Sequence, residues 1–555
     1  MTLASTVLRQ GSLPAAPVPA RHRASALARG KALLSALALA GCLALANCDD
    51  QESAAAPPPP VALTQEAMGH YCGMALVEHP GPKGQILLRG DERPVWFSSA
   101  RDTIAFTLLG EEAKSIRAIY VSDMGKAESW EQPGAANWVE ARGAFFVLGS
   151  NRRGGMGAEE AVPFSDRAAA ERFATEHGGA VRSFAEVPPD WVLGDGAAPR
   201  RGRKPGPLLL AVLNTATRIE DWPHAACCLS PPGPWHFRRS GRFRPAGNRR
   251  HARRSSLLTW TGPVLGATGS IMLHHPDRIA AERLVARCVA EIRRLEALFN
   301  LWQAESQLSA LNRRGMLVAP APEMVDLLTT AKQVAAWSDG VFDPTVQPLW
   351  LLYRDHFAAE GADPQGPSPH ALAEALSLVD HRRLVVSPDR ILLTRRGMAV
   401  TLNGIAQGYL TDRIVDLLRG GGVAQTLVDM GEARGVGRHP SGRPWRASLE
   451  NPAASDHPWA ELDLTDRALA TSADSGFVFD GAGRFTHLLD PCSGQSPRRY
   501  RTVSVLAPEA TMADAFSTAF ALMPEPAIAA ALCGRPDVEA HLLRPDGSTA
   551  LLHGT

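Results

Sequence analysis

The stretch VTLNGIAQGYLTDRIVDLL, residues 400–418, joins a short apolar run to a helical segment through a turn of small residues. Small residues at a strand-to-helix junction let backbone amides approach a phosphate and leave carbonyl oxygens open to a metal ion. A single glycine cluster is more often an ordinary turn, so the surrounding motifs decide its meaning. With those motifs, the stretch predicts a nucleotide-pyrophosphate site.

A second motif, TMADAFSTAFAL at residues 511–522, places Asp514 and Thr518 four positions apart on a predicted helix. A carboxylate and a hydroxyl on one helix face can hold a hard cation, although such a pair is more often solvent-exposed or a capping arrangement. Upstream, a strand-like segment at residues 264–275 precedes residues 280–302, whose apolar spacing predicts an amphipathic helix. Cys288 and Cys533 lie in apolar, helical surroundings and are expected to be buried.

Five further motifs complete the C-terminal half: residues 305–315, 337–350, 426–437, 469–476 and THLLDPCSGQSP at 486–497. In this order the set resembles the ApbE family, which are FAD:protein FMN transferases, over nearly all of residues 256–555. LNGIAQGYLTDR with LVDMGEARGVG resembles the NosX branch, which serves nitrous oxide reduction.

The resemblance to ApbE proteins implies an α+β fold and a magnesium ion held by Asp514, Thr518 and the carbonyl of Ala406 or its neighbour. It makes His487 a candidate for proton transfer, with a structural histidine that caps the turn as the alternative. It also implies further residues at the FAD site: Glu305, Ser338, Asp339, Asp343, Thr345, Gly404, Gln407, Gly408, Ser472 and Asp474. Many relatives carry Lys where this chain has Gln407, so a charged contact to phosphate is in doubt.

The implied reaction is attack by a protein Thr or Ser hydroxyl on the FMN-side phosphorus of FAD, with release of AMP. The expected acceptor is the membrane flavoprotein that supplies electrons to nitrous oxide reductase. A non-catalytic FAD-binding module is the alternative.

The N-terminal half contains HYCGMALVEHPGPKGQI at residues 70–86, with His70, Cys72 and Met74 at alternate positions. In an extended strand these side chains would point the same way, and thiolate and thioether ligands select Cu(I). Met156, in the Gly-rich segment GGMGAEEAVPF, is a further candidate ligand. The alternative is that the methionines fill the core and that Cys72 is a buried thiol.

These segments, with IYVSDMG at residues 119–125 and residues 129–150, resemble the NosL family of lipoproteins, which deliver copper for nitrous oxide reductase maturation. The resemblance implies a small α+β domain at residues 61–195 that binds Cu(I). Cys72 and Met74 are its first ligand candidates, with Met156 as a further candidate and His70 as a weaker one. Its expected partner is nitrous oxide reductase or the copper-loading machinery of that enzyme.

Residues 1–48 read as an export signal, with basic residues before an uncharged apolar run from Ala32 to Ala46. Leu39-Ala40-Gly41-Cys42 resembles a lipobox, which predicts a lipid on Cys42, with Cys48 as the poorer candidate. The run is shorter than the roughly 20 residues that a spanning helix needs. We therefore expect a lipid-anchored protein on the periplasmic side of the bacterial inner membrane.

Two segments are predicted to connect the folded parts: a Pro-rich tether at residues 49–60 and an Arg/Pro-rich, disordered linker at residues 196–255. Hydrophobic residues make up 45% of the chain, and the net charge of +1 gives no global attraction to nucleic acid. The interpretation is thus a two-domain fusion, with 256–555 as the transferase domain. A fusion joined by chance or by a shifted frame is the remaining alternative.

Overall fold

A computed structural model describes residues 57–91, 93–109, 115–193, 257–451 and 454–554 of the chain. We call residues 59–193 the N-terminal part and residues 257–554 the C-terminal part; both belong to one compact unit, Pro59–Thr555. The export signal with Cys42 and Cys48, most of the tether, and the linker lie outside the described residues. None of the described helices combines the length and apolar character that a bilayer crossing requires.

The N-terminal part contains two antiparallel sheets with strand orders β2-β1-β3-β4 and β6-β5-β7. Helix α2 packs on the first sheet and α3 on the second. Their common core is apolar and includes Phe97, Ile119 and Phe146. The elements are β1 (Gly84–Leu88), β2 (Val95–Phe97), α2 (Ala100–Leu108), β3 (Ile116–Ser122), β4 (Trp138–Glu140), β5 (Phe145–Leu148), β6 (Val162–Phe164), α3 (Arg167–His177), β7 (Ala180–Ser183) and α4 (Pro189–Leu193), with short 3-10 turns at Leu76–Glu78, Ala141–Gly143 and Phe184–Glu186.

The C-terminal part is built on a large antiparallel sheet with strand order β20-β19-β18-β17-β14-β13-β9-β8. Its strands are β8 (Leu257–Val264), β9 (Ala267–His274), β13 (Thr426–Asp429), β14 (Ala433–Val436), β17 (Ala468–Ala473), β18 (Thr502–Ala507), β19 (Glu539–Leu543) and β20 (Thr549–His553). Strands β15 (Arg446–Asn451) and β16 (Ala454–Asp463) form a separate hairpin. A 3-stranded sheet has the order β10-β12-β11, with β10 (Met316–Val318), β11 (Leu384–Val386) and β12 (Arg390–Leu393).

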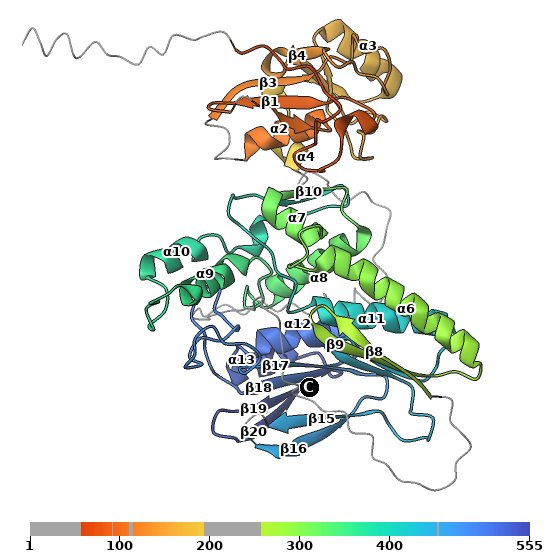
Figure 1. The fold of residues 1–555 in the computed structure, drawn as a ribbon, viewed down its shortest axis with the longest axis vertical. Coiled ribbons are helices and arrows are strands. Elements are labelled where there is room, and N and C mark those ends of the chain that lie inside the picture. The colour runs from red at the N-terminus through yellow and green to blue at the C-terminus, as the bar shows by residue number, and fades with distance from the viewer. Residues whose placement is uncertain (1–56, 92, 110–114, 194–256, 452–453, 555) are drawn as a thin grey trace, which may run out of the picture. The chain divides into compact units, whose positions relative to one another are not determined.

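Helices cover one face of the large sheet, and the β15–β16 hairpin covers the other (Figure 1). Alternate residues of β17 separate these layers: Ala468 and Ala470 face the helices, while Leu469 faces the hairpin. The helices are α6 (Arg278–Phe299), α7 (Gln307–Arg314), α8 (Pro322–Trp337), α9 (Gln347–Ala358), α10 (Pro369–Leu376), α11 (Ala406–Gly420), α12 (Ala510–Phe520) and α13 (Glu525–Leu532), with a 3-10 turn, η5, at His381–Arg383.

The α+β expectation is therefore confirmed, and the helix predicted at residues 280–302 is α6. Cys288 is fully buried on α6, as expected. The prediction for Cys533 is wrong, because this residue is exposed. Helix α13 ends at Leu532, so Cys533 is the first residue beyond the helix and no longer lies on its apolar face.

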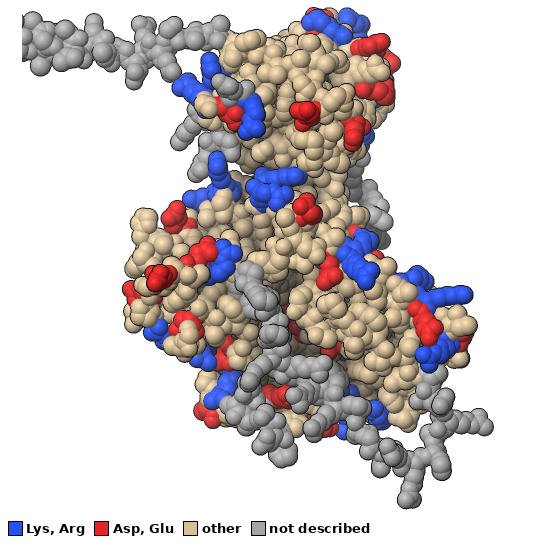
Figure 2. Space-filling view, in the orientation of Figure 1, with Lys and Arg blue, Asp and Glu red and all other residues tan. Residues whose placement is uncertain are grey.

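On the face seen in Figure 2, acidic and basic side chains are interspersed over both parts. This pattern agrees with the net charge of +1. The visible face therefore offers mixed charges instead of a broad region of one sign.

Two carboxylates from neighbouring helices cap each other's helices. Asp412 of α11 accepts hydrogen bonds from the backbone amides of Ala510 and Thr511 at the start of α12, at 2.9 and 2.8 Å. Asp514 of α12 in turn accepts one from the amide of Gly408, in the first turn of α11, at 3.0 Å. Helix N-termini carry unpaired N–H groups and partial positive charge, so both contacts are favourable.

We expect Asp412→Asn to lower the free energy of unfolding of the C-terminal part by about 3 kcal/mol. Besides capping α12, Asp412 forms an ion pair of 2.5 Å with the buried Arg434, which the substitution would leave without its carboxylate. Urea unfolding measures the change. Asp416→Asn, an exposed aspartate one turn further along α11, is the control and should change the free energy little.

Candidate functional site

The predicted pair Asp514 and Thr518 lies on α12, next to the turn that begins α11. A Cβ atom on Gly404 would lie 2.8 Å from the Thr518 hydroxyl oxygen. A Cβ atom on Gly408 would lie 2.3 Å from the carbonyl oxygen of Ala510. Both glycines are therefore required for close approach of the two segments.

The residues around Asp514 suit a hard cation. Asp514 uses one carboxylate oxygen for Gly408, and Thr518 brings a hydroxyl to the backbone of Gly404. Ala406, the first residue of α11, is buried beside them. Among the residues that the structure describes, no group of three or more His, Cys, Asp or Glu forms a metal cluster. Asp514 and the Thr518 hydroxyl are the oxygen ligands that this part of the site offers a cation.

Burial raises the pKa of Asp514 to about 7, while the Gly408 N–H lowers it and the nearby Asp412 raises it. Burial also raises the pKa of Glu432 well above its ordinary value, and Asp514 and Asp429 add to that rise. Glu432 accepts a hydrogen bond from the Thr471 amide at 3.2 Å. The centre therefore holds more buried carboxyl groups than nearby positive charge, which favours a cation.

Glu432, Asp412 and Arg434 were assigned no role from sequence, although all three lie in the motifs quoted above. The sequence did contain a signal for the two acids, because acidic residues within motifs of small residues are candidates for binding a charged ligand. What sequence does not show is that Asp412 pairs with Arg434 and that Glu432 acts electrostatically on Asp514.

Several predicted FAD-site residues do lie beside this centre. Ser472 of β17 and Ser517 of α12 have their hydroxyl oxygens 2.9 Å apart. Gln407 packs against Gly431, whose Cβ atom would lie 2.4 Å from the Gln407 amide nitrogen. The chain after α8 also comes close, since a Cβ atom on Gly404 would lie 3.3 Å from the Phe342 ring.

Within that chain segment, Asp343 and Thr345 are held by local contacts. Asp343 accepts hydrogen bonds from the Thr345 amide and hydroxyl, at 2.8 and 2.6 Å, and from the His381 amide at 3.0 Å. Ser338 caps the end of α8, and Asp339 follows with a positive φ of 51°. These contacts fix the path of the loop beside Gly404.

Two predicted FAD-site residues have other surroundings. Glu305 is exposed between α6 and α7, where its charge acts on Arg314. Asp474 forms an ion pair of 2.7 Å with Arg498. Neither contact joins these residues to the carboxylate centre, so their assignment to the FAD site stays a prediction.

His487 lies in the loop between β17 and β18, against Gly476. A Cβ atom on Gly476 would lie 2.7 Å from its imidazole ring. Nδ1 of the ring lies 3.1 Å from the Phe477 amide nitrogen and 3.2 Å from the Phe477 carbonyl oxygen, so it bonds to this backbone in either tautomer. Burial lowers the pKa of His487 to about 4, so the ring is neutral near pH 7. With Nδ1 held by the backbone, Nε2 is the atom available to a substrate.

The strand geometry predicted for His70, Cys72 and Met74 is wrong. These residues form a tight turn, closed by the Gly69 amide bonding to the Met74 carbonyl at 2.9 Å, and Gly73 has a positive φ of 67°. The alternating spacing therefore does not align the side chains as on a strand. His70 instead packs its ring against Tyr71, Phe97 and Phe106.

The remaining copper-ligand candidates lie in adjoining segments. Cys72 is partly exposed, and Met74 has 37% of its surface exposed. The loop that carries Met156 contacts the end of the Cys72 segment, since a Cβ atom on Gly155 would lie 2.6 Å from that of His79. This contact joins the loops at Gly155 and His79, so the assignment of Met156 to the same copper site as Cys72 and Met74 stays a prediction.

Comparisons with known proteins match each part separately. The model of the ApbE family matches residues 265–542, and the model of the NosL family matches residues 60–192. The copper-binding lipoprotein NosL of Achromobacter cycloclastes is 49% identical over 144 residues, covering 26% of this chain and 75% of the relative.

An FAD:protein FMN transferase of Treponema pallidum (strain Nichols) is 30% identical over 286 residues, which cover 45% of this chain and 77% of the relative. Among solved structures, the apo form of the flavinyl transferase ApbE from Pseudomonas stutzeri is 29% identical. It covers 55% of this chain and 97% of the solved chain, with a TM-score of 0.46.

We expect the stability of the C-terminal part to fall as the pH drops from about 6.5 toward 4, in part because of His487. Its pKa is 6.5 ordinarily and about 4 in the fold, so between these values the unfolded chain binds the extra proton. In His487→Gln, which does not titrate, thermal unfolding should lose less stability between pH 7 and pH 5. His553→Gln, at an exposed histidine, should behave like the unchanged chain. Equal pH dependence in all three proteins would contradict the assignment.

Proposed function

Because the chain belongs to the ApbE family over residues 265–542 and to the NosL family over residues 60–192, we propose that it attaches FMN to a protein and also delivers Cu(I). The observation that carries the transferase proposal is the convergence of Asp514, Thr518 and the Gly404–Gly408 turn. The flavin acceptor is a Thr or Ser of a membrane flavoprotein of the nitrous oxide reduction system.

In the proposed reaction, an acceptor hydroxyl attacks the FMN-side phosphorus of FAD. A new P–O bond forms to the acceptor, the bond to the bridging oxygen breaks, and AMP leaves with that oxygen. Asp514, Thr518 and the carbonyl of Ala406 or its neighbour would hold a magnesium ion, which supplies neutralisation of pyrophosphate charge.

This chain's own residues bind FAD and handle the hydroxyl proton. The side-chain amide of Gln407, in the first turn of α11, is the proposed contact for phosphate oxygens, because the backbone amides of Ala406 and Gly408 already donate to Leu402 and Asp514. His487 is the candidate proton acceptor, because it is neutral near pH 7 and the tautomer whose Nδ1–H donates to the Phe477 carbonyl leaves the Nε2 lone pair free. The contact of Nδ1 with Phe477 equally supports the alternative role, in which the ring braces the loop.

For the N-terminal part, we propose Cu(I) binding by Cys72 and Met74, with Met156 as a further ligand. Nitrous oxide reductase, or the machinery that loads it, receives the ion. A lipid on Cys42 anchors the chain to the periplasmic face of the inner membrane. Because both activities are on one chain, copper delivery and flavin attachment act at the same membrane surface.

We expect Asp514→Asn to slow FMN transfer by at least about a thousandfold, since it removes the only charged group proposed on the magnesium ion. The test supplies FAD, magnesium and an acceptor flavoprotein, then follows in-gel flavin fluorescence and AMP. Thr518→Val should slow transfer less, because water can replace a neutral oxygen.

Asp537→Asn, at an exposed aspartate, is the control for this series and should transfer FMN normally. Normal transfer by Asp514→Asn at limiting magnesium would rule out the proposed metal site. Tight FAD binding by the unchanged chain with no AMP release would instead favour a non-catalytic FAD-binding metallochaperone.

We expect Cys72→Ser to abolish Cu(I) binding by the chain, because a hydroxyl is a hard and protonated ligand at neutral pH. Met74→Ala should weaken binding less, since a neutral thioether contributes less to holding the ion. Competition with a Cu(I) chelator measures both. Cys533→Ser, at another exposed thiol, is the control and should bind normally. Tighter binding of zinc than of Cu(I) would overturn the proposal.

A further inference from the structure

The 3-stranded sheet β10-β12-β11 carries buried apolar side chains on both faces. Pairing places Met316 beside Leu392 and Leu392 beside Val385, so these three side chains share one face. The residues between them, such as Leu317 and Ile391, belong to the core of the C-terminal part. The Met316 face therefore needs a different cover.

That cover is the N-terminal part. Met316, Val318, Val385 and Leu392 belong to the same apolar cluster as Phe97, Phe106 and Val192. Met316 and Leu392 have 0% of their surface exposed. A face of this kind would be an exposed apolar patch if the two parts were separated.

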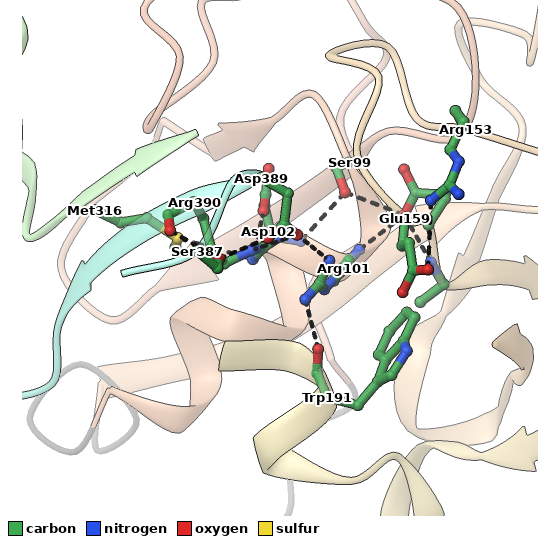
Figure 3. A network of polar contacts seen from close by, with 12 residues as sticks. Ser99, Arg101, Asp102, Arg153, Glu159, Trp191, Met316, Ser387, Asp389 and Arg390 are labelled. Atoms are coloured by element: carbon green, nitrogen blue, oxygen red, sulfur yellow. Dashed lines mark hydrogen bonds and ion pairs between the residues drawn. The ribbon is translucent and has the colours of Figure 1, made fainter. Parts of the chain in front are cut away.

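Two ion pairs of opposite orientation accompany this apolar contact, and Figure 3 shows the four residues that form them. Arg101, near the start of α2, pairs with Asp389 at 2.5 Å, and the next residue, Asp102, pairs with Arg390 at 3.1 Å. The Asp102 and Arg390 side chains are only 2% and 1% exposed. Charges this deeply buried are strongly unfavourable unless they are paired.

Arg101 is held further within its own part. It donates a hydrogen bond of 2.6 Å to the Trp191 carbonyl, and its guanidinium lies 4.6 Å from the centre of the Trp191 ring. Arg101 is therefore oriented before it meets Asp389, which reduces the entropy lost in forming the ion pair.

A third contact reaches the Cys72 turn. Arg314, the last residue of α7, donates a hydrogen bond of 2.6 Å to the carbonyl of Tyr71. A Cβ atom on Gly73 would lie 2.2 Å from the Arg314 guanidinium, so only glycine leaves room for it. The charge of Arg314 also interacts with Cys72. A side chain of the C-terminal part thus supports the turn that carries the candidate copper ligands.

We propose that the Met316 face of the β10-β12-β11 sheet is a docking surface for the N-terminal part of the same chain, with Arg314 as a positioning residue for the Cys72 turn. The copper aspect rests on the proposed function, whereas the docking does not. Met68, Met74 and Val77 stay exposed, so a copper partner approaches the turn from their side. The turn that carries the proposed copper ligands is then held in place by the C-terminal part, through Arg314.

Hydrogen exchange on the full chain tests the docking. In Arg390→Gln the buried Asp102 loses its partner, and exchange of the α2 amides should rise by roughly a hundredfold. Combining Arg390→Gln with Asp102→Asn should raise exchange by less than the product of the single effects. Arg167→Gln, at an exposed ion pair on α3, is the control and should leave α2 unchanged.

Unchanged exchange of α2 in folded Arg390→Gln, or fully multiplicative effects in the double variant, would overturn the docking. If Arg390→Gln does not fold, Asp389→Asn replaces it, because Asp389 is 27% exposed and tolerates the change better. The same two outcomes then decide, with Arg101→Gln as the second substitution.

Competition with a Cu(I) chelator tests the role of Arg314. Arg314→Gln should weaken Cu(I) binding by the full chain about tenfold, as loss of a group that orients a metal ligand does. The control is Arg313→Gln, because Arg313 contacts the Ala304 carbonyl within the C-terminal part. Equal binding by both variants would overturn the role of Arg314. Failure of the unchanged chain to bind Cu(I) would refute the proposed copper function and leave the exchange result standing.

Discussion

The arrangement of the candidate catalytic centre depends on reciprocal capping, in which a carboxylate of α11 binds the start of α12 and a carboxylate of α12 binds the start of α11. Asp412 caps the start of α12, and Asp514 bonds to an amide in the first turn of α11. Each helix thus satisfies part of the other's unpaired N–H groups, and Arg434 balances one of the two carboxylates. Sliding one helix along the other would break the capping contacts at the starts of both helices. These contacts therefore fix the position of α11 relative to α12.

The two carboxylates nevertheless differ in what they have left to offer. Asp412 is saturated, with three hydrogen bonds from α12 and an arginine partner. Asp514 has one backbone donor and lies near Glu432, a second buried acid. One carboxylate therefore fits a structural role, and the other has capacity for a cation or a proton. The same pair of helices can provide stability and reactivity because these tasks fall on different side chains.

The sequence predicted the helices correctly where the signal was the spacing of nearby residues. The four-residue interval between Asp514 and Thr518 and the apolar period of α6 both predicted helices that the structure contains. The alternation of His70, Cys72 and Met74 predicted a strand and did not reveal the turn. The turn is closed by a hydrogen bond from the Gly69 amide to the Met74 carbonyl, which the spacing of side chains does not indicate. For Cys533, the apolar run continued to the helix end and gave no sign of where the helix stops.

Contacts between segments far apart in the chain could not be predicted from the sequence, for a different reason. The pairing of Asp102 with Arg390 spans about half of the chain, and an Arg-Asp or Asp-Arg pair alone is an ordinary surface feature. The short strands of β10 and β12 likewise gave no indication that both of their faces are covered. Their partners become visible only when the fold brings them together.

Small side chains on β17 have a mechanical consequence for this centre. Strand β17 packs against α12 (Figure 1). Ala468, Ala470 and Ser472 lie on the side of the strand that meets the helix, and Ser472 contacts Ser517 directly. Because only small side chains lie between α12 and β17, the two elements pack closely, and the strand beneath Asp514 is rigidly placed relative to the helix. Any opening or closing that a bulky dinucleotide requires must then come from the surrounding loops, such as the one that carries His487, while α12 and β17 keep their positions.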